Sequence, residues 1–352
     1  MFVFSLGGAT RADDDRAVLE GVPKIGYDVH LCPFPGSLYA VLEYLGDPCD
    51  YDYLMGVTGA AFRRLWNKDD GGNVDLMYLA PEPYERAAKA LGRELRFIGS
   101  KDRAELIREI KASIAEGRPV LAFGIIGPPE CGIVTGHDRG GAVLYGWSYF
   151  QDPQLKGYYE KADWFERGTE TGPPSLLIVG PKKEGEEAPR HDTFISSLEW
   201  AIDLARTPRR PSLPNHVAGL AAYDAWANGL EVDADYPMDD RKVMETRGMV
   251  QTDQCVMLHE RNSAAKYLRS MLDVAPEAAA DLDAAAALYE EAASMGGDLW
   301  LGGEWNDPAV QKRFADPALR RKMAASVRIA RDKETRAVEH LEAALRLLKG
   351  AQ

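Results

Sequence analysis

Apolar residues in the first half of the chain begin with the period of a helix. Between residues 35 and 45 they recur at the i, i+3, i+4, i+7 spacing that places them on one helical face: Leu38, Val41, Leu42 and Leu45. Ser37 or Gly36 marks the predicted start of this helix, and Gly46 marks its end. Two further helices are predicted: Pro83–Leu91 and Arg103–Glu116.

After Gly117 the apolar residues form short runs separated by turn residues, which is typical of strands. Four strands are predicted: Pro119–Ile126, Gly132–Thr135, Ala142–Tyr149 and Ser175–Val179. The segment His137–Gly141 is the predicted turn between the second and the third strand. Short strands joined by a glycine-rich turn and preceded by helices favour an α+β fold with an antiparallel sheet over a parallel one.

The second half of the chain has an almost wholly helical pattern, with Asn262 and Asp316 as suitable helix caps. The predicted helices are Thr193–Arg206, Val217–Leu230, Ser263–Val274, Pro276–Met295 and Pro317–Leu348. A charged stretch rich in proline and glycine, residues 181–189, precedes them and is typical of a linker. We therefore expect a lead-in segment (1–22), an α+β domain (23–180) and an all-helical domain (190–352).

Composition and charge narrow the possible classes of function. The 352 residues are 45% hydrophobic and 28% charged, as in globular proteins, and they suffice for two domains. The net charge of −13 argues against nucleic-acid binding, which needs a basic face. No apolar run reaches the ~20 residues of a membrane span, and the first residues lack the basic region of a signal peptide. We therefore expect a cytoplasmic protein with no membrane partner.

The four cysteines are Cys32, Cys49, Cys131 and Cys255. Their scattered positions suit a reducing compartment with free thiols better than a disulfide framework. No cysteine or histidine pair has the short spacing of a zinc site, so we expect no metal, and no motif indicates a cofactor.

Cys32 lies just before the first predicted helix, two residues after His30. The free N–H groups and the dipole at a helix start stabilise a thiolate, which makes a weak thiol a usable nucleophile. The alternative is structural, because free cysteine is also a common small buried residue.

A second segment, from Gly117 to Pro153, contains Gly-x-Pro-Val, then Val-Thr-Gly-x-Asp-x-Gly-Gly, then Asp-Pro. Together with a cysteine before a helix that ends in Tyr-x-Gly, this order resembles papain-like peptidases that trim double-glycine leader peptides. It is more similar still to the N-terminal domain of the butirosin biosynthesis protein H family, which are cysteine-dependent acyltransferases of that fold. The resemblance covers about Val22 to Pro153. It implies a papain-like domain followed by a helical part.

The resemblance also implies roles for particular residues. Cys32 matches the nucleophile, although it stands one residue off the usual distance from Gly46, and Asp152 matches the orienting acid. The family's general base is a histidine at the start of the Val-Thr-Gly strand, where this chain has Glu130 and Cys131.

Another group would therefore have to act as the base. Glu130 could do so only if burial raised its pKa towards neutrality. His30 could approach Cys32 if the backbone bends at Pro33, whereas His137 is expected at the surface in its turn.

Aromatic residues offer walls for a ligand near Glu130 and Asp152. The rings of Trp66, Trp147, Tyr149, Phe150 and Trp164 either fill a core or line a pocket for a cationic or aromatic molecule. The candidate ligand contacts are His30, Ser37, Cys131, Trp147, Tyr149, His216, Tyr223 and Trp226. The last three fall on a predicted helix that could close over the first domain or pack between the domains.

Two polar clusters complete the candidates. The acidic stretch 69–75 lacks the spacing of a calcium loop, so a solvated turn is the better interpretation. The cluster His259–Arg261 could close over the first domain in the same way as the helix with His216.

Three functions follow from these patterns. The first is cysteine-dependent acyl transfer or amide hydrolysis on a small molecule or peptide, with Cys32, Glu130 and Asp152 as catalytic residues. The second is a non-catalytic protein of the same fold that binds a cationic or aromatic small molecule. The third is a structural or interaction protein that uses the helical domain, and the oligomeric state stays open.

Overall fold

The computed structural model describes residues 15–70, 79–124, 126–127, 130–152, 154–162, 164, 175–183 and 185–350. The chain folds into two compact units that are not continuous in sequence. The first unit combines the residues up to Val29 with Ala40–Pro48 and Arg96–Val179. The second combines His30–Tyr39, Cys49–Leu95 and the residues from Gly180 onward. The sequence-based division at residues 181–189 stays a prediction.

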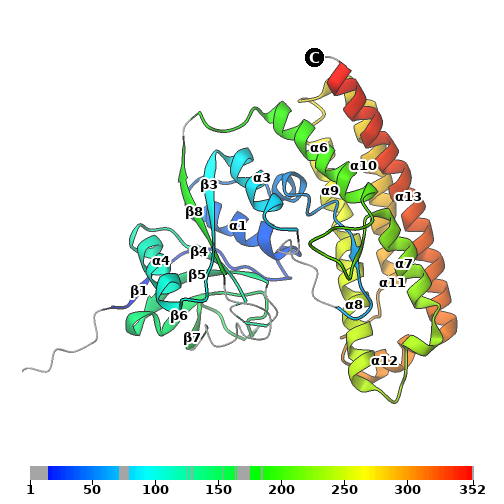
Figure 1. Ribbon diagram of the computed structural model, residues 1–352, viewed down its shortest axis with the longest axis horizontal. Helices are drawn as coiled ribbons and strands as arrows, with labels where there is room; N and C mark the ends of the chain where they lie inside the picture. The colour runs from blue at the N-terminus through cyan, green and yellow to red at the C-terminus, as the bar shows by residue number, and fades with distance from the viewer. Residues whose placement is uncertain are drawn as a thin grey trace, which may run out of the picture. The chain divides into compact units, whose positions relative to one another are not determined.

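The main sheet has seven strands within the described residues, and most of it belongs to the first unit (Figure 1). Across the sheet the order is β3 (Arg93–Gly99), β8 (Ser175–Lys182), β4 (Val120–Phe123), β5 (Cys131–Asp138), β6 (Val143–Trp147) and β7 (Tyr159–Ala162). The short β1 (Ala17–Val18) pairs with β5. β4 is antiparallel to β5 and β8, and β6 is antiparallel to β5 and β7. This confirms the predicted antiparallel sheet in a fold of mixed helices and strands.

Two glycines allow neighbouring strands to approach closely in this sheet. A Cβ on Gly136 would lie 2.4 Å from the carbonyl oxygen of Ala17 in β1. A Cβ on Gly146 would lie 2.0 Å from the carbonyl oxygen of Ile133 in β5. Any side chain at these positions would therefore force β1 or β6 away from β5.

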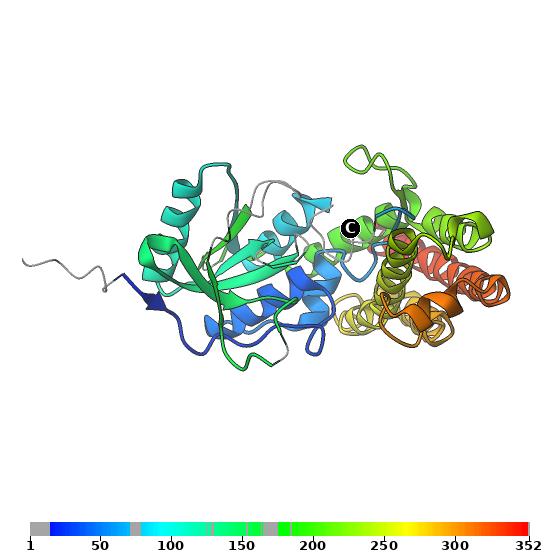
Figure 2. The same cartoon turned by 90° about the horizontal axis from the view of Figure 1, so that it is seen from below.

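Helix α4 (Arg103–Ala115) packs on β4 and β5 and closes the core of the first unit (Figure 2). The helix begins after Asp102, whose carboxylate accepts the backbone N–H of Ala104. Apolar residues four apart on α4 face apolar residues of the sheet, and both sets are buried: Leu106, Ile110, Ile114, Val120, Ala122, Val134, Leu144, Leu176 and Ile178.

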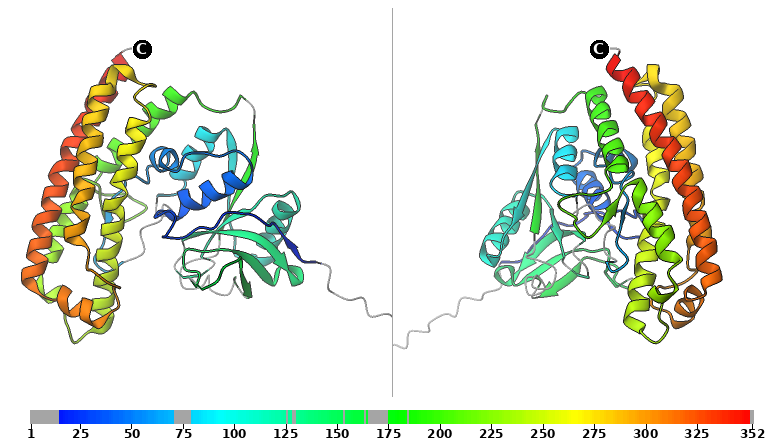
Figure 3. Two further views of the ribbon diagram at one scale, coloured as in Figure 1. Left: turned by 180° about the vertical axis from the view of Figure 1, so that it is seen from behind. Right: turned by 45° about the vertical axis from the view of Figure 1, so that its right-hand side comes forward.

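In the second unit, three helices lie along the long helix α13 (Pro317–Gly350). They are α6 (Arg190–Arg206), α7 (Leu220–Leu230) and α10 (Ala279–Ser294), and Figure 3 shows α10 and α13 side by side. Glu291 pairs with Lys333 and Asp281 with His340, so residue numbers run in opposite directions and α10 is antiparallel to α13.

The remaining elements complete this unit. They are α1 (Pro33–Tyr44, which continues into the first unit), α2 (Tyr51–Val57), β2 (Leu65–Trp66), α3 (Glu82–Leu91), β9 (Val217–Ala218), α8 (Arg241–His259), α9 (Arg261–Arg269), α11 (Gly296–Leu299) and α12 (Pro308–Phe314). α2 packs on α9 at Gly56, where a Cβ would lie 2.2 Å from the ring of Tyr267. The absence of a side chain at Gly56 therefore sets how closely the two helices approach.

Several predicted positions relative to helices and strands are wrong. Val217 does not start a helix, because it pairs with Trp66 of β2, and α7 begins only at Leu220; His216 is therefore not helical. His137 is not in a surface turn, because β5 continues through it and pairs with Ala17, which buries the imidazole. Ser37 does not lie at a helix start, because α1 begins at Pro33.

The helix caps divide in the same way. Asp316 is confirmed, since its carboxylate accepts the N–H of Ala318. Asn262 lies inside α9, where its amide donates to the carbonyl oxygen of His259, so it is not a cap. Helix α8 and strands β3 and β7 were not predicted from the sequence at all.

Candidate functional site

A cavity of about 310 Å³ lies in the first unit, between the segment 24–28 and the segment that follows β6. The first segment contributes Lys24, Ile25, Gly26, Tyr27 and Asp28, and the second contributes Ser148, Tyr149, Gln151, Asp152 and Leu155. Two residues predicted from the sequence, Tyr149 and Asp152, thus lie in the wall of one cavity. The segment with Tyr27 was not predicted as part of a site.

Tyr27 is the central aromatic residue of this wall. Its ring meets Tyr149 edge to face, with 5.0 Å between the ring centroids, and meets Phe150 edge to face at 6.1 Å. Tyr27 is 39% exposed as a residue, whereas Tyr149 is buried. Tyr27 therefore presents an aromatic surface that is already held in place by its neighbours.

A hydrogen bond to Glu130 fixes the hydroxyl end of Tyr27. The Tyr27 hydroxyl donates to Oε2 of Glu130 at 2.6 Å, and the Glu130 side chain is buried. A hydrogen bond to a carboxylate is stronger than one between neutral groups, so it fixes the orientation of the phenol ring. Glu130, predicted as a catalytic or ligand-contacting residue, acts here on the cavity through Tyr27.

The charged residues in the cavity wall are two carboxylates, Asp28 and Asp152, and one lysine, Lys24. Asp152 is exposed and accepts the backbone N–H of Gln154 at 2.8 Å. Asp28 pairs with Lys24 at 2.8 Å, and this hydrogen bond lowers the pKa of the Asp28 carboxyl. Lys24 thus compensates Asp28 locally, and the charge of Asp152 remains available to a ligand.

Trp147 and Cys131, both predicted as ligand contacts, serve the framework of this unit. The Trp147 indole is buried, donates to the carbonyl oxygen of Val22 at 3.0 Å, and meets the Tyr158 ring at 5.1 Å. Cys131 is buried at the start of β5. Trp147 therefore anchors the irregular segment that leads to Tyr27, and it is not a lining residue of the cavity.

Cys32 belongs to the second unit, and it lies where the sequence placed it, at the N-terminus of a helix. Its carbonyl oxygen accepts the N–H of Gly36 at 3.0 Å, so Cys32 occupies the cap position of α1. Its own N–H donates to the hydroxyl of Tyr51 at 3.1 Å. The side chain is 0% exposed.

His30 stacks on the same tyrosine. Its ring lies 3.9 Å from the Tyr51 ring at an interplanar angle of 12°, and Tyr39 meets it edge to face. Partial burial lowers the pKa of His30, although Asp52 and Asp50 oppose the shift. The imidazole is therefore neutral near pH 7 and is able to accept a proton. Burial also raises the pKa of Tyr51, which keeps that phenol protonated.

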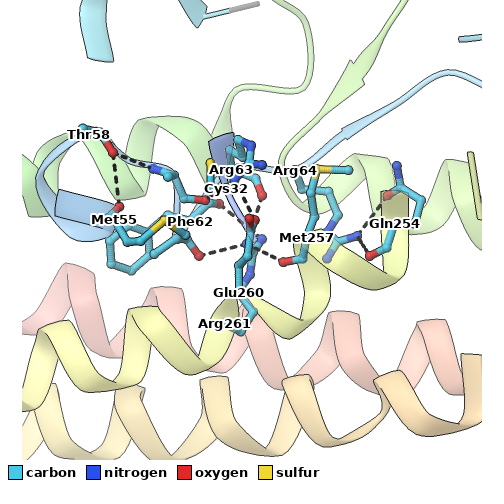
Figure 4. A network of polar contacts seen from close by, with 12 residues as sticks. Cys32, Met55, Thr58, Phe62, Arg63, Arg64, Gln254, Met257, Glu260 and Arg261 are labelled. Atoms are coloured by element: carbon cyan, nitrogen blue, oxygen red, sulfur yellow. Dashed lines mark hydrogen bonds and ion pairs between the residues drawn. The ribbon is translucent and has the colours of Figure 1, made fainter. Parts of the chain in front are cut away.

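Buried ion pairs lie beside this cluster (Figure 4). Arg63 donates to Glu260 at 2.7 Å, and both side chains are buried. Arg261, which follows Glu260, forms a bidentate ion pair with Glu334, with hydrogen bonds of 2.7 and 2.8 Å. It also donates to the carbonyl oxygens of Ala61, Phe62, Arg63 and Met257. Glu260 and Arg261 of the polar cluster His259–Arg261 thus fix residues 61–63, which follow α2.

The predicted contacts on and before α7 belong to the core of the second unit. The Tyr223 hydroxyl donates to Glu334, and the Trp226 indole donates to Gln251 at 2.9 Å. His216 is buried, with Nε2 3.2 Å from a carboxylate oxygen of Asp70. Ser37 is buried inside α1. The burial of Tyr223 and Trp226 indicates packing within this unit.

Of the expected catalytic residues, Cys32 belongs to the second unit, whereas Glu130 and Asp152 belong to the first. Their convergence in one cleft stays a prediction. Of the acidic stretch 69–75, residues 71–75 lie outside the described part of the chain. All four cysteines are free thiols. Within the described ranges, no cluster of histidine, cysteine and acidic side chains is arranged to hold a metal ion.

No helix in the described part of the chain combines the length and apolar character needed to cross a bilayer. A search against models of known protein families finds no match, and a search of curated proteins finds none either.

Proposed function

We propose that the chain binds a small cationic molecule with an aromatic or planar body in the cavity around Tyr27. The observation that carries the proposal is that one wall holds both an exposed tyrosine fixed by its neighbours and a carboxylate, Asp152, with no ion-pair partner among the described residues. This is the binding function expected from the sequence, with Tyr27 in the place of Trp147 as the stacking residue.

The chemistry of the wall fits such a ligand. A cation over a tyrosine ring is stabilised by about 0.5–2 kcal/mol, depending on how far it is desolvated. A hydrogen bond from a charged donor to Asp152 contributes about 1.5–3 kcal/mol. Because Glu130 and Tyr149 already hold Tyr27, little ordering is needed when the ligand enters.

Benzamidine and benzamide test the proposal by calorimetry, because they share shape but only benzamidine is cationic. We expect benzamidine to bind more tightly, and Asp152→Asn to weaken it by roughly ten- to a hundredfold. Glu160→Gln, at an exposed carboxylate on β7, is the matched control and should leave affinity unchanged. Equal affinity for the two probes, or an unaltered affinity in Asp152→Asn, would refute the proposal.

A second candidate function, thiol-dependent acyl transfer in a papain-like domain, is favoured by the position of Cys32. The cap position on α1 favours a thiolate, and the neutral His30 stacks on the tyrosine that contacts the Cys32 backbone. In this function, His30 takes the thiol proton and the sulfur attacks a carbonyl carbon. The leaving amine or alcohol departs with that proton and a thioester remains on Cys32. Water then hydrolyses the thioester, which releases the acyl group as a carboxylic acid and regenerates the thiol.

Because the Cys32 side chain is fully buried, this candidate requires local opening around α1. Iodoacetamide labelling read by mass spectrometry tests it, with p-nitrophenyl acetate as the acyl donor. We expect Cys32→Ala to abolish turnover, whereas Cys49→Ala, at a partly exposed thiol, should retain it. Turnover that survives in Cys32→Ala would eliminate the thiol mechanism and leave the binding proposal untouched.

A further inference from the structure

A second cavity, of about 360 Å³, lies wholly within the second unit. It is lined by Leu31, Cys255, Val256, His259, Gly296 and Trp300. We infer that this cavity is a separate binding site for a small apolar molecule with an aromatic or branched aliphatic body and one hydrogen-bonding group. The inference does not depend on the proposed function, which concerns the first unit.

One wall is a face of helix α8. His259 is four residues after Cys255 and three after Val256, so its side chain neighbours both on the helix surface. Cys255 is fixed there, because its thiol lies 3.3 Å from the carbonyl oxygen of Leu299 and accepts from the amide of Gln251. Burial raises the pKa of Cys255 to about 12, so this thiol stays protonated and acts as an apolar wall.

Further lining residues come from α11 and from the residue after it. Helix α11 begins at Gly296. No neighbouring atom lies within 4 Å of the place where a Cβ on Gly296 would be, so there is free space in the wall at that point. Trp300 follows the helix and is 49% exposed. An indole that is half exposed at the edge of an apolar cavity is well placed to cover a ligand with its ring face.

The size of the cavity selects the kind of ligand. About 360 Å³ is at the lower end of the range for small-molecule sites, about 300–1,000 Å³. A helix with its side chains is about 10–12 Å across and needs far more space. His259 is exposed, and its imidazole is the lining group that can exchange a hydrogen bond with the polar end of a ligand.

The full chain titrated with 1-anilinonaphthalene-8-sulfonate tests the site, because this probe fluoresces when its rings enter an apolar cavity. We expect saturable binding of one probe per chain, with energy transfer from tryptophan. Val256→Trp fills the cavity and should weaken binding at least tenfold. Trp300→Ala removes the exposed ring and should weaken binding by roughly two- to tenfold.

Ile329→Ala is the matched control, since Ile329 is equally exposed but lies on α13 outside the cavity. It should leave the binding constant unchanged. Trp300→Ala keeps the test valid if Val256→Trp fails to fold, because Trp300 is largely outside the core. Probe binding that is unchanged in Trp300→Ala and in a folded Val256→Trp would overturn the inference, as would equal weakening by Ile329→Ala.

Discussion

Removing the guanidinium of Arg261 is expected to destabilise the second unit strongly. In Arg261→Met, the Glu334 carboxylate stays buried and loses both hydrogen bonds from Arg261. It keeps the hydrogen bond that the Tyr223 hydroxyl donates. Four backbone carbonyl oxygens lose a donor as well.

The magnitude follows from the burial of the pair. Breaking a buried ion pair by removing one partner costs about 3–5 kcal/mol, because the remaining carboxylate loses its bidentate partner and keeps only the Tyr223 hydroxyl and the charge of Arg64. For a helical unit of this size, each kcal/mol lowers Tm by about 2–4 °C, so a decrease of roughly 6–20 °C is expected. Arg331→Met, which removes an exposed pair with Asp224, should cost less than about 1 kcal/mol.

Thermal unfolding followed by circular dichroism at 222 nm measures both variants. The double variant Arg261→Met/Glu334→Leu also removes the isolated charge, so it should regain part of the loss. A Tm for Arg261→Met within a degree of that of the unaltered chain would contradict the buried, coupled interaction described above. So would a loss of stability in the double variant equal to the sum of the losses in Arg261→Met and in Glu334→Leu.

Three further predictions concern single side chains. Burial and the nearby Asp70 raise the pKa of Asp253 to about 7, so the folded chain holds this proton more tightly than the unfolded one. The stability that the protonated carboxyl contributes is complete below about pH 4 and is lost as the pH rises through 7. Asp253→Asn should therefore raise Tm at pH 8 but not at pH 4. A difference in Tm that does not depend on pH would contradict this prediction. Gly56→Ala should cost about 1–3 kcal/mol in urea unfolding because its Cβ meets Tyr267, whereas Gly297→Ala, which meets nothing, should not. Trp147→Phe should lose about 1 kcal/mol with the hydrogen bond to Val22, and an unchanged urea midpoint would mean that this bond contributes nothing.

The elements that the sequence predicted are those with a strong local signal. The helices α1, α3 and α4 carry apolar faces of helical period, and β4 and β8 are continuous apolar runs. Helix α8 was missed because polar residues interrupt its buried face: Arg247, Gln251 and Gln254 are buried among apolar residues and hydrogen-bond to other segments of the same unit. Such polar residues are buried only because they hydrogen-bond to residues far away in the sequence. A local sequence pattern does not contain those partners.

The site divides along the same line. Asp152 was predicted from the family resemblance of its Asp-Pro pair and Tyr149 as an aromatic residue close to it in sequence, and both line the cavity of the first unit. Tyr27 was missed because its importance comes from a bond to Glu130, 103 residues later. A single exposed tyrosine in an irregular segment carries no signal by itself, although its position next to Asp28 and Lys24 marks a polar segment.

The pairing of early arginines with late partners has a consequence for biosynthesis. Arg63 finds its carboxylate in Glu260, 197 residues further along the chain. At about 5–20 residues per second, a ribosome needs roughly 10–40 s to make that stretch. During this interval the nascent segment around Arg63 lacks the carboxylate that pairs with its buried guanidinium. Folding of the second unit therefore has to wait until most of the polypeptide has left the ribosome.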